Sequence, residues 1–285
     1  MTERWRKFLV MGASLFILLA GGFLVIRQGI WHASAKKYRQ SQVPTLYLHG
    51  YGSSYKAEES LVKAALNSGA SSGVIRANVS KSGKVSLKGK FTANVNNPLV
   101  EVNFADNKNG NYHQDGAYLK AVVEKLQARY QIKQFNVVAH SMGNMAVAYY
   151  LLDNGQNKKL PRLNKQVSLA GHYNGILNYD APKDASLGKD GAPKVQTNSY
   201  QALLPLKKRY PKQVAVLNIY GDLNDGSHSD GRVANASSKS LAYLVADRAA
   251  SYQELVIKGK GGQHSRLHEN RRVAQRIVNF LFLKS

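Results

Sequence analysis

The fold is decided by one stretch in the middle of the chain, Phe135-Asn136-Val137-Val138-Ala139-His140-Ser141-Met142-Gly143-Asn144-Met145-Ala146. A β-favouring run leads into a turn of small residues, and a helical pattern of apolar residues follows immediately. This order predicts a strand, a sharp turn and a helix, the context in which a serine becomes an exposed nucleophile. Ala139 and Gly143, two residues before and after Ser141, are small enough for that turn. The alternative interpretation is a buried strand followed by a helix that Ser141 merely caps.

The composition permits a large globular domain and excludes several kinds of site. The chain has 285 residues, of which 44% are hydrophobic, so a sizeable core does not need disulfide bonds. The absence of cysteine excludes a disulfide scaffold, thiolate metal ligands and a cysteine nucleophile. The formal net charge of +23 indicates an anionic neighbour, and anionic cell-wall polymers are one such partner. We find no nucleic-acid-binding motif and therefore expect no nucleic-acid partner.

The N-terminal segment contains a run of 19 residues without a charge, residues 8–26. At about 1.5 Å per residue, a helix of this length nearly spans a hydrocarbon core of roughly 30 Å. Residues 1–35 are therefore predicted to be a membrane anchor, and three basic residues before the run favour a cytoplasmic N-terminus. The alternative is a signal peptide cleaved near residues 33–35, which would make the protein secreted. Under both interpretations, residues 36–285 form an exported domain.

Strand and helix patterns alternate along the rest of the chain. Strands are predicted at 43–48, 73–79, 84–91, 98–104, 135–139, 166–170, 214–220 and 252–257. Helices are predicted at 57–67, 116–130, 145–152, 238–249 and 271–282. This alternation indicates one α/β domain with a mostly parallel sheet and right-handed crossovers.

The segment 172–205 is irregular and is predicted to be a cap-like insertion over the site. Its apolar residues either line an acyl pocket or pack in the core, and the pattern does not decide between these roles for Tyr173, Ile176, Leu177, Tyr179, Tyr200, Leu203 and Leu204.

Polar residues follow four of the predicted strands, and the carboxyl ends of parallel strands meet at one edge of a sheet. The turn His49-Gly50-Tyr51-Gly52 follows the first strand, and the Ser141 turn follows a later one. We expect the backbone N–H groups of Tyr51 and Met142 to form an oxyanion hole.

A loop at 221–233 carries the candidate acids. Asp230 is predicted to orient a catalytic histidine, because Asp-Gly-x-Val places a carboxylate in a turn that returns to the core. Asp222 and Asp225 are the alternatives. Closely spaced acids also resemble a calcium loop, but the loop lacks the twelve-residue pattern and its terminal Glu, so no metal is expected.

Two histidines follow the last predicted strand, His264 and His268. His264 is the predicted general base because it closely follows the glycine pair Gly261-Gly262 and precedes Ser-x-Leu, whose leucine would anchor the loop. His268 is the alternative base, at the start of the final helix. Together with Ser141, these residues predict acyl transfer through an acyl-enzyme.

With these pieces, the chain resembles the α/β-hydrolase superfamily. More narrowly, it resembles a family of lipase-like, often membrane-anchored cell-surface hydrolases of Gram-positive bacteria. The resemblance covers about Thr45 to Leu283, and Ala139 stands where the pattern usually has glycine. It implies an α/β-hydrolase fold, a triad of Ser141, Asp230 and His264, and a serine ester hydrolase without a cofactor at the outer cell surface. A non-catalytic binding or adhesion module on the same scaffold is the alternative.

Overall fold

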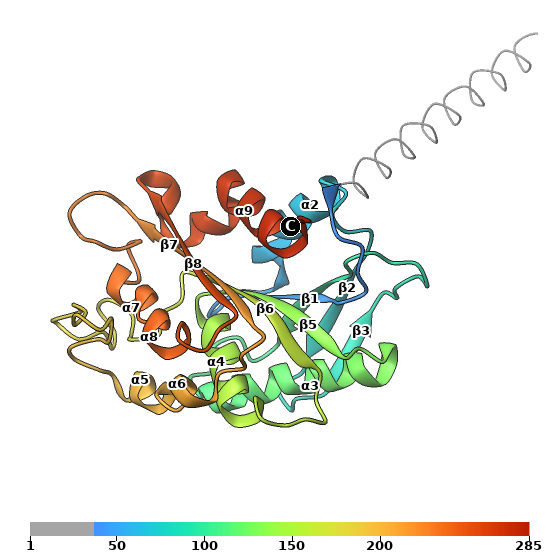
Figure 1. The fold of residues 1–285 in the computed structure, drawn as a ribbon, viewed down its shortest axis with the longest axis horizontal. Helices are drawn as coiled ribbons and strands as arrows, with labels where there is room; N and C mark the ends of the chain where they lie inside the picture. The colour runs from blue at the N-terminus through green and yellow to red at the C-terminus, as the bar shows by residue number, and fades with distance from the viewer. Residues whose placement is uncertain (1–36, 285) are drawn as a thin grey trace, which may run out of the picture.

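The structure is a computed structural model that describes residues 37–284. Its centre is one eight-stranded sheet with the strand order β3-β2-β4-β1-β5-β6-β7-β8 (Figure 1). All neighbouring strands are parallel except β2 and β3, which are antiparallel. The strands are β1 (Thr45–Leu48), β2 (Val74–Val79), β3 (Val85–Lys88), β4 (Leu99–Phe104), β5 (Gln134–His140), β6 (Arg162–Leu169), β7 (Ala215–Asp222) and β8 (Ser251–Lys258).

Helices cover both faces of this sheet (Figure 1). On one face lie α2 (Glu59–Asn67) and α9 (Arg271–Phe282). The other face is covered by α3 (Tyr112–Tyr130), α4 (Met142–Asn154), α5 (Asn198–Leu203), α6 (Leu206–Arg209) and α8 (Leu241–Val245). The remaining helices are α7 (Asn235–Lys239) and the 3-10 helices η1 (Tyr55–Glu58), η2 (Lys260–Gly262) and η3 (His264–Glu269).

The central strand β5 shows how the sequence builds two cores. Val137 and Ala139 belong to the core beneath α3 and α4, whereas Val138 belongs to the core beneath α2 and α9. Successive side chains of a strand point to opposite faces of the sheet, so each core receives alternate residues. Both faces are covered, and β5 is therefore buried at every residue from 135 to 140 rather than at alternate residues.

Two predicted helices differ from those in the structure. The helix predicted at 116–130 begins at Tyr112, because the side chain of Asn111 caps it and accepts hydrogen bonds from two backbone N–H groups. The single helix predicted at 238–249 is wrong: α7 and α8 meet at Ser240 instead. The Ser240 carbonyl accepts a hydrogen bond from the hydroxyl of Tyr200, and such a contact with a distant segment is invisible to a local pattern.

The irregular segment 172–205 contains the short helix α5, which the sequence pattern does not predict. Tyr173, Tyr200 and Leu203 are fully buried and belong to the core, so they do not line a pocket. Tyr179, in contrast, is 83% exposed. The predicted strand at 166–170 also begins earlier, at the start of β6.

The predicted membrane anchor at 8–26 lies outside the described residues. Within residues 37–284, no helix is both long enough and apolar enough to cross a bilayer. The two ends of the described chain lie side by side, because Tyr38 pairs with Leu283 in an isolated antiparallel bridge. The described chain therefore begins next to the end of α9.

The sheet register brings the candidate loops to one edge. Leu48 at the end of β1 pairs with Ala139 near the end of β5, and Asp222 at the end of β7 pairs with Lys258 at the end of β8. The segments that follow these four strands contain Tyr51, Ser141, Asp230 and His264. In an open parallel sheet, this carboxyl edge is where ligands bind.

Candidate active site

Ser141 occupies a strained turn between β5 and α4. Its backbone has φ 51° and ψ −120°, a conformation that residues with a Cβ rarely adopt. Gly143 is required next to it, since a Cβ at that position would lie 2.9 Å from the Leu48 carbonyl oxygen. The side chain of Asn144 donates hydrogen bonds to the carbonyls of Ser141 and Leu169, which ties the turn to β6. The local sequence therefore does form the turn that it predicts.

Ser141, His264 and Asp230 form one hydrogen-bonded chain. The Oγ of Ser141 lies 3.0 Å from Nε2 of His264, and Nδ1 of His264 lies 2.7 Å from Oδ2 of Asp230. Each of these side chains is buried, and Ser141 and His264 are each 8% exposed. Because a carboxylate accepts at Nδ1, the proton of the neutral imidazole belongs on Nδ1, and Nε2 is free to accept from the serine.

The structure also explains why Asp230 points at the histidine. Its Oδ1 accepts hydrogen bonds from the backbone N–H groups of Arg232 and Val233, at 2.9 and 2.7 Å. These contacts leave Oδ2 for His264, whose own backbone N–H donates to the Asp230 carbonyl. The Asp-Gly-x-Val turn thus fixes the carboxylate as its sequence context predicts.

The alternative residues lie in other places. The carboxylate of Asp222 accepts from the N–H of Asn224 in the same loop and from the side-chain amide of Asn235 in α7. Asp225 is exposed and accepts from the N–H of Ser227. Among residues 37–284, the acids of this loop do not form a group of three ligand-type atoms close enough together to hold a metal ion. His268 donates from Nδ1 to the Ala57 carbonyl and has no contact with Ser141.

The two backbone N–H groups that the sequence predicts to form an oxyanion hole belong to Tyr51 and Met142. No acceptor for either group is found among the described residues. His49 holds the Tyr51 turn from below, because its Nδ1 bonds the Gly50 carbonyl at 2.9 Å and its Nε2 accepts from the N–H of Phe104 at 3.1 Å. Burial lowers the pKa of His49, which keeps the ring in the neutral form that this pair of bonds needs. A Cβ at Gly50 would lie 3.0 Å from the Cβ of Ser141, so a larger residue there would crowd the serine.

His172 and Tyr112 lie on the side of the site where β6 ends. Their ring centroids are 6.0 Å apart, and Tyr112 in turn packs against Tyr149. Burial lowers the pKa of His172 to about 4, so this ring is neutral under ordinary conditions. Neither residue was a sequence candidate, because an isolated histidine or tyrosine in an irregular segment carries no recognisable pattern.

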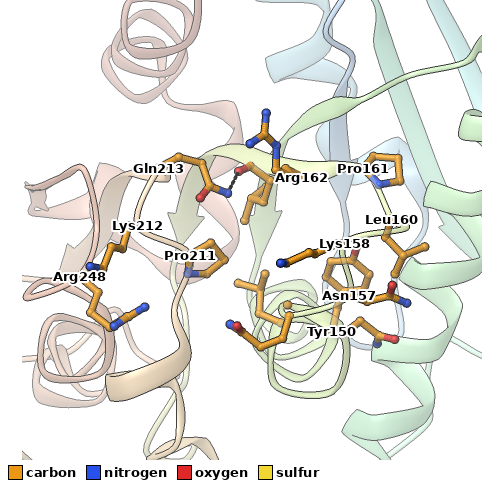
Figure 2. Close-up of a pocket in the computed structure, with 15 residues that line it drawn as sticks. Tyr150, Asn157, Lys158, Leu160, Pro161, Arg162, Pro211, Lys212, Gln213 and Arg248 are labelled. Carbon is orange, nitrogen blue, oxygen red and sulfur yellow. Dashed lines mark hydrogen bonds between the residues drawn. The ribbon is translucent and has the colours of Figure 1, made fainter.

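One cavity lies away from this site, at the amino ends of β6 and β7 (Figure 2). It measures about 300 Å³ and is lined by four basic side chains and no acidic one. The basic residues are Lys158, Arg162, Lys212 and Arg248. The hydrogen-bonded chain of Ser141, His264 and Asp230 does not line this cavity.

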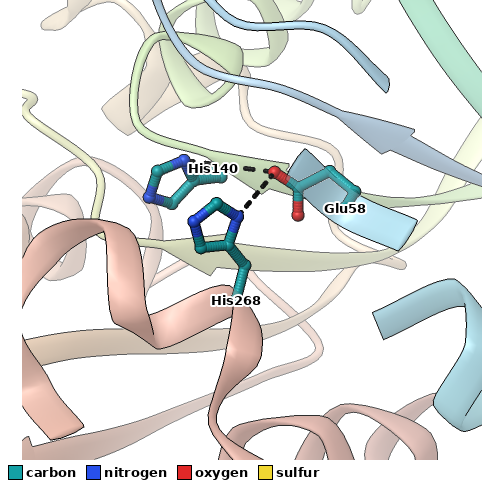
Figure 3. Close-up of side chains that lie close together, drawn as sticks. All are labelled: Glu58, His140 and His268. Atoms are coloured by element: carbon teal, nitrogen blue, oxygen red, sulfur yellow. Dashed lines mark ion pairs between the residues drawn. The ribbon is translucent and has the colours of Figure 1, made fainter. Parts of the chain in front are cut away.

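A second cluster of titratable groups lies directly behind Ser141 and was also missed by sequence reasoning. Glu58, His140 and His268 place one ligand-type atom each within 4.8 Å of one another, the one such group of three among residues 37–284 (Figure 3). Glu58 and His140 are buried, and His268 is partly buried. The only sequence signal for Glu58 was an acid at the start of a helical pattern, which usually indicates a solvated face.

Comparison with known proteins identifies the fold and the family of this chain. A structure of the lin2722 gene product of Listeria innocua is 25% identical, with a TM-score of 0.77 over 85% of this chain and 94% of that one. A candidate cell surface hydrolase from Lactobacillus plantarum WCFS1 is 20% identical, with a TM-score of 0.65 over 84% of this chain and 89% of that one. No curated protein matches the chain significantly. Residues 32–284 match the family described as alpha/beta hydrolase of unknown function (DUF915), and the chain belongs to this family.

Proposed function

We propose that this protein is a serine hydrolase that cleaves carboxylic esters or lipids through an acyl-enzyme. The observation that carries the proposal is the continuous hydrogen-bonded chain from Ser141 through His264 to Asp230, with the serine held at a strained turn. Nucleophile, base and orienting acid in this arrangement are the parts that acyl transfer needs. A serine that only capped α4 would not explain the chain, and the Ser141 side chain makes no capping bond.

The proposed reaction has two halves. Ser141 Oγ attacks the acyl carbon while its proton moves to Nε2 of His264, and Asp230 stabilises the imidazolium through Nδ1. The N–H groups of Tyr51 and Met142 donate to the oxyanion that forms. His264 then gives the proton to the departing alkoxide, which leaves as the alcohol. In the second half, water gives its proton to His264 and attacks the acyl-enzyme, and the acid and the free serine are released.

We place this reaction at the outer cell surface, with a single N-terminal anchor at residues 8–26 or, alternatively, in the secreted form after cleavage of that segment. The support is the uncharged run itself, which has the length of a bilayer-spanning helix. Protease treatment of intact cells tests the location: an outward-facing domain is digested without lysis, and a protected domain would contradict the placement.

Labelling with a fluorophosphonate tests the chemistry. We expect the probe to modify Ser141 and the label to be lost in Ser141→Ala and strongly reduced in His264→Ala. His113→Ala is the matched control, because His113 is an exposed histidine paired with Asp153 outside the site. A panel of p-nitrophenyl esters of increasing acyl length then identifies the substrate class. Ester hydrolysis that persists in Ser141→Ala would contradict the proposal.

A second candidate function, a non-catalytic surface-binding module, is favoured by the basic cavity of Figure 2. Its four basic side chains have no acidic residue beside them in the lining. A narrow anionic polymer such as a cell-wall polyphosphate fits a concave site better than a flat membrane does. None of the four basic side chains pairs with a described carboxylate. Binding of such a polymer at this cavity is also compatible with the hydrolase proposal, because the net charge of +23 predicts an anionic partner in either case.

Binding of a fluorescein-labelled polyphosphate distinguishes this candidate. We expect Lys158→Ala combined with Arg162→Ala to weaken binding about tenfold or more, because two phosphate contacts are removed. The matched control combines Lys84→Ala with Lys88→Ala, two exposed lysines on the β3 hairpin. Equal loss in both double variants would mean that the polymer recognises net charge and not the cavity.

A further inference from the structure

Glu58 is the most unusual group in the described chain. It ends η1, just after the Tyr51 turn, and is 0% exposed. Neither of its carboxyl oxygens has a hydrogen-bond partner among the described residues. An ionised carboxylate in such a place is strongly unfavourable, so the group should keep its proton and direct it to a nearby acceptor.

Two imidazoles face this carboxyl group (Figure 3). Oε1 of Glu58 lies 4.0 Å from Nδ1 of His140 and 3.8 Å from Nδ1 of His268. Tyr47, on the neighbouring strand β1, is the other titratable group here, and its buried hydroxyl also lacks a partner. Burial, and secondly the charge of Glu58, raise the pKa of Tyr47, so the phenol is neutral.

The backbone contacts of the two histidines identify which nitrogen can accept. Nε2 of His140 lies 3.2 Å from the carbonyl oxygen of His264, and a carbonyl can only accept, so Nε2 carries the proton. The same argument places a proton on Nδ1 of His268, which lies 2.7 Å from the Ala57 carbonyl. Nδ1 of His140 is therefore the lone pair that faces Glu58.

The charge states agree with this assignment. Burial raises the pKa of Glu58 to about 8 and lowers the pKa of His140 well below its usual value. Burial also lowers the pKa of His268. At neutral pH the cluster is thus a protonated carboxyl group beside two neutral imidazoles. A hydrogen bond from Glu58 to His140 requires the carboxyl group to rotate and to shorten the distance of 4.0 Å between Oε1 and Nδ1.

The same contacts argue against a metal ion, although two histidines and a glutamate are a familiar donor set. The rings of His140 and His268 are stacked, with centroids 4.8 Å apart and an interplanar angle of 11°. Lone pairs in two parallel rings do not converge on one cation. In addition, Nδ1 of His268 is already committed as a donor to Ala57. The residues do not fit a metal centre in this arrangement.

His140 connects the cluster to the reacting groups. It directly precedes Ser141, its Nε2–H holds the backbone carbonyl of His264, and its ring packs 4.9 Å from the His264 ring. We propose that Glu58, as a neutral hydrogen-bond donor to Nδ1 of His140, is a positioning residue that keeps His264 aligned with Ser141. This inference rests on the proposed hydrolase function. The role depends on the protonated carboxyl group, because an ionised Glu58 has no O–H to donate to His140.

The consequence is a loss of activity on the alkaline side. Above a pH of about 8, Glu58 loses its proton, and a carboxylate then faces the lone pair of His140 instead of donating to it. Glutamine at this position keeps a donor N–H at every pH. Alanine removes the donor altogether and leaves a gap behind His140.

Steady-state kinetics of the full chain in detergent, with a p-nitrophenyl ester between pH 6 and pH 10, test the inference. We expect Glu58→Ala to lower kcat about tenfold or more with little change in KM, because a misaligned base affects the chemical step. Glu58→Gln should restore most of that loss and should abolish the alkaline decline. Glu59→Gln is the matched control, because Glu59 is the next residue in the chain and pairs only with Lys63.

Wild-type kcat in Glu58→Ala, or an alkaline decline that persists in Glu58→Gln, would overturn the inference. Failure of the proposed function gives a different result, namely turnover that survives Ser141→Ala. Nitrogen NMR of the histidines provides a readout that does not depend on turnover or on the folding of Glu58→Ala. At pH 7 His140 should carry its proton on Nε2 in the wild type and in Glu58→Gln. A proton on Nδ1, or loss of both His140 and His268 signals with one equivalent of Zn²⁺, would overturn it.

Discussion

Glycine at position 141 should give a more stable protein than alanine at the same position, although both replacements remove the same hydroxyl. The φ of 51° and ψ of −120° at Ser141 force a Cβ into contact with its own backbone. Glycine has no Cβ and reaches this conformation without strain. The hydrogen bond to His264 is lost in both variants, so its contribution cancels in the comparison.

The expected difference follows from two opposing terms. Relief of the strained conformation contributes about 1–3 kcal/mol in favour of glycine. The greater freedom of glycine in the unfolded chain offsets about 0.4–1 kcal/mol of that gain. The glycine variant should therefore unfold with a free energy about 1 kcal/mol higher than the alanine variant. Under the proposed function, the Ser141→Gly variant should be inactive. The turn at Ser141 would then be a site where the residue that activity needs is less stable than glycine.

Urea unfolding of both variants, followed by circular dichroism, measures the difference. Ala148→Gly is the matched control, because Ala148 lies within α4, where the backbone is helical and glycine is unfavourable by about 1 kcal/mol. Glycine should thus give the higher free energy of unfolding at position 141, and alanine should give the higher value at position 148. If glycine is the less stable residue at both positions, the strained turn is not a feature of the folded protein and the argument fails.

Three further outcomes are expected. Asp230→Asn should lower kcat about 10³–10⁴-fold, because an amide favours the wrong imidazole tautomer, whereas Asp225→Asn should leave ester hydrolysis unchanged. Gly116→Ala should destabilise the protein by about 1–3 kcal/mol in urea, since its Cβ would lie 2.8 Å from the backbone nitrogen of Tyr150 where α3 crosses α4. Burial raises the pKa of Asp115 from 3.8 to about 7, so the unfolded chain loses this proton first and stability should fall as pH rises from about 4 to about 7. Asp115→Asn should remove that part of the pH dependence, and a slope equal to that of the wild type would contradict the assignment.

Much of the fold and of the candidate site is predictable from sequence because the decisive signals are local. The turn at Ser141 needs small neighbours, and Gly143 is visible in the sequence as one of them. The structure adds the reason, which is the close approach of the Leu48 carbonyl at the end of β1. The Asp230 carboxylate is oriented by N–H groups two and three residues further along, so its role is encoded within one turn. The choice of His264 over His268 also depends on local spacing after β8, and the structure places only His264 beside Ser141.

The features that sequence reasoning missed depend on distant contacts. The break between α7 and α8 is coupled to the hydroxyl of Tyr200, which lies 40 residues earlier than Ser240. In the sequence, Glu58 has the pattern of an exposed helix residue. In the structure it is buried, and His268 of η3, more than 200 residues later, lies beside its carboxyl group. Burial of a charged side chain without a partner is a property of the packed molecule, and no local pattern signals it.

The wide separation of the site residues in the sequence has a consequence for truncated chains. The turn at Ser141 depends on β6, because the N–H of Ser141 and the side chain of Asn144 both donate to the Leu169 carbonyl. The imidazole that contacts Oγ of Ser141 comes from a residue 123 positions further along, after β8. Under the proposed function, a chain that stops before residue 264 should therefore contain the serine and leave esters intact.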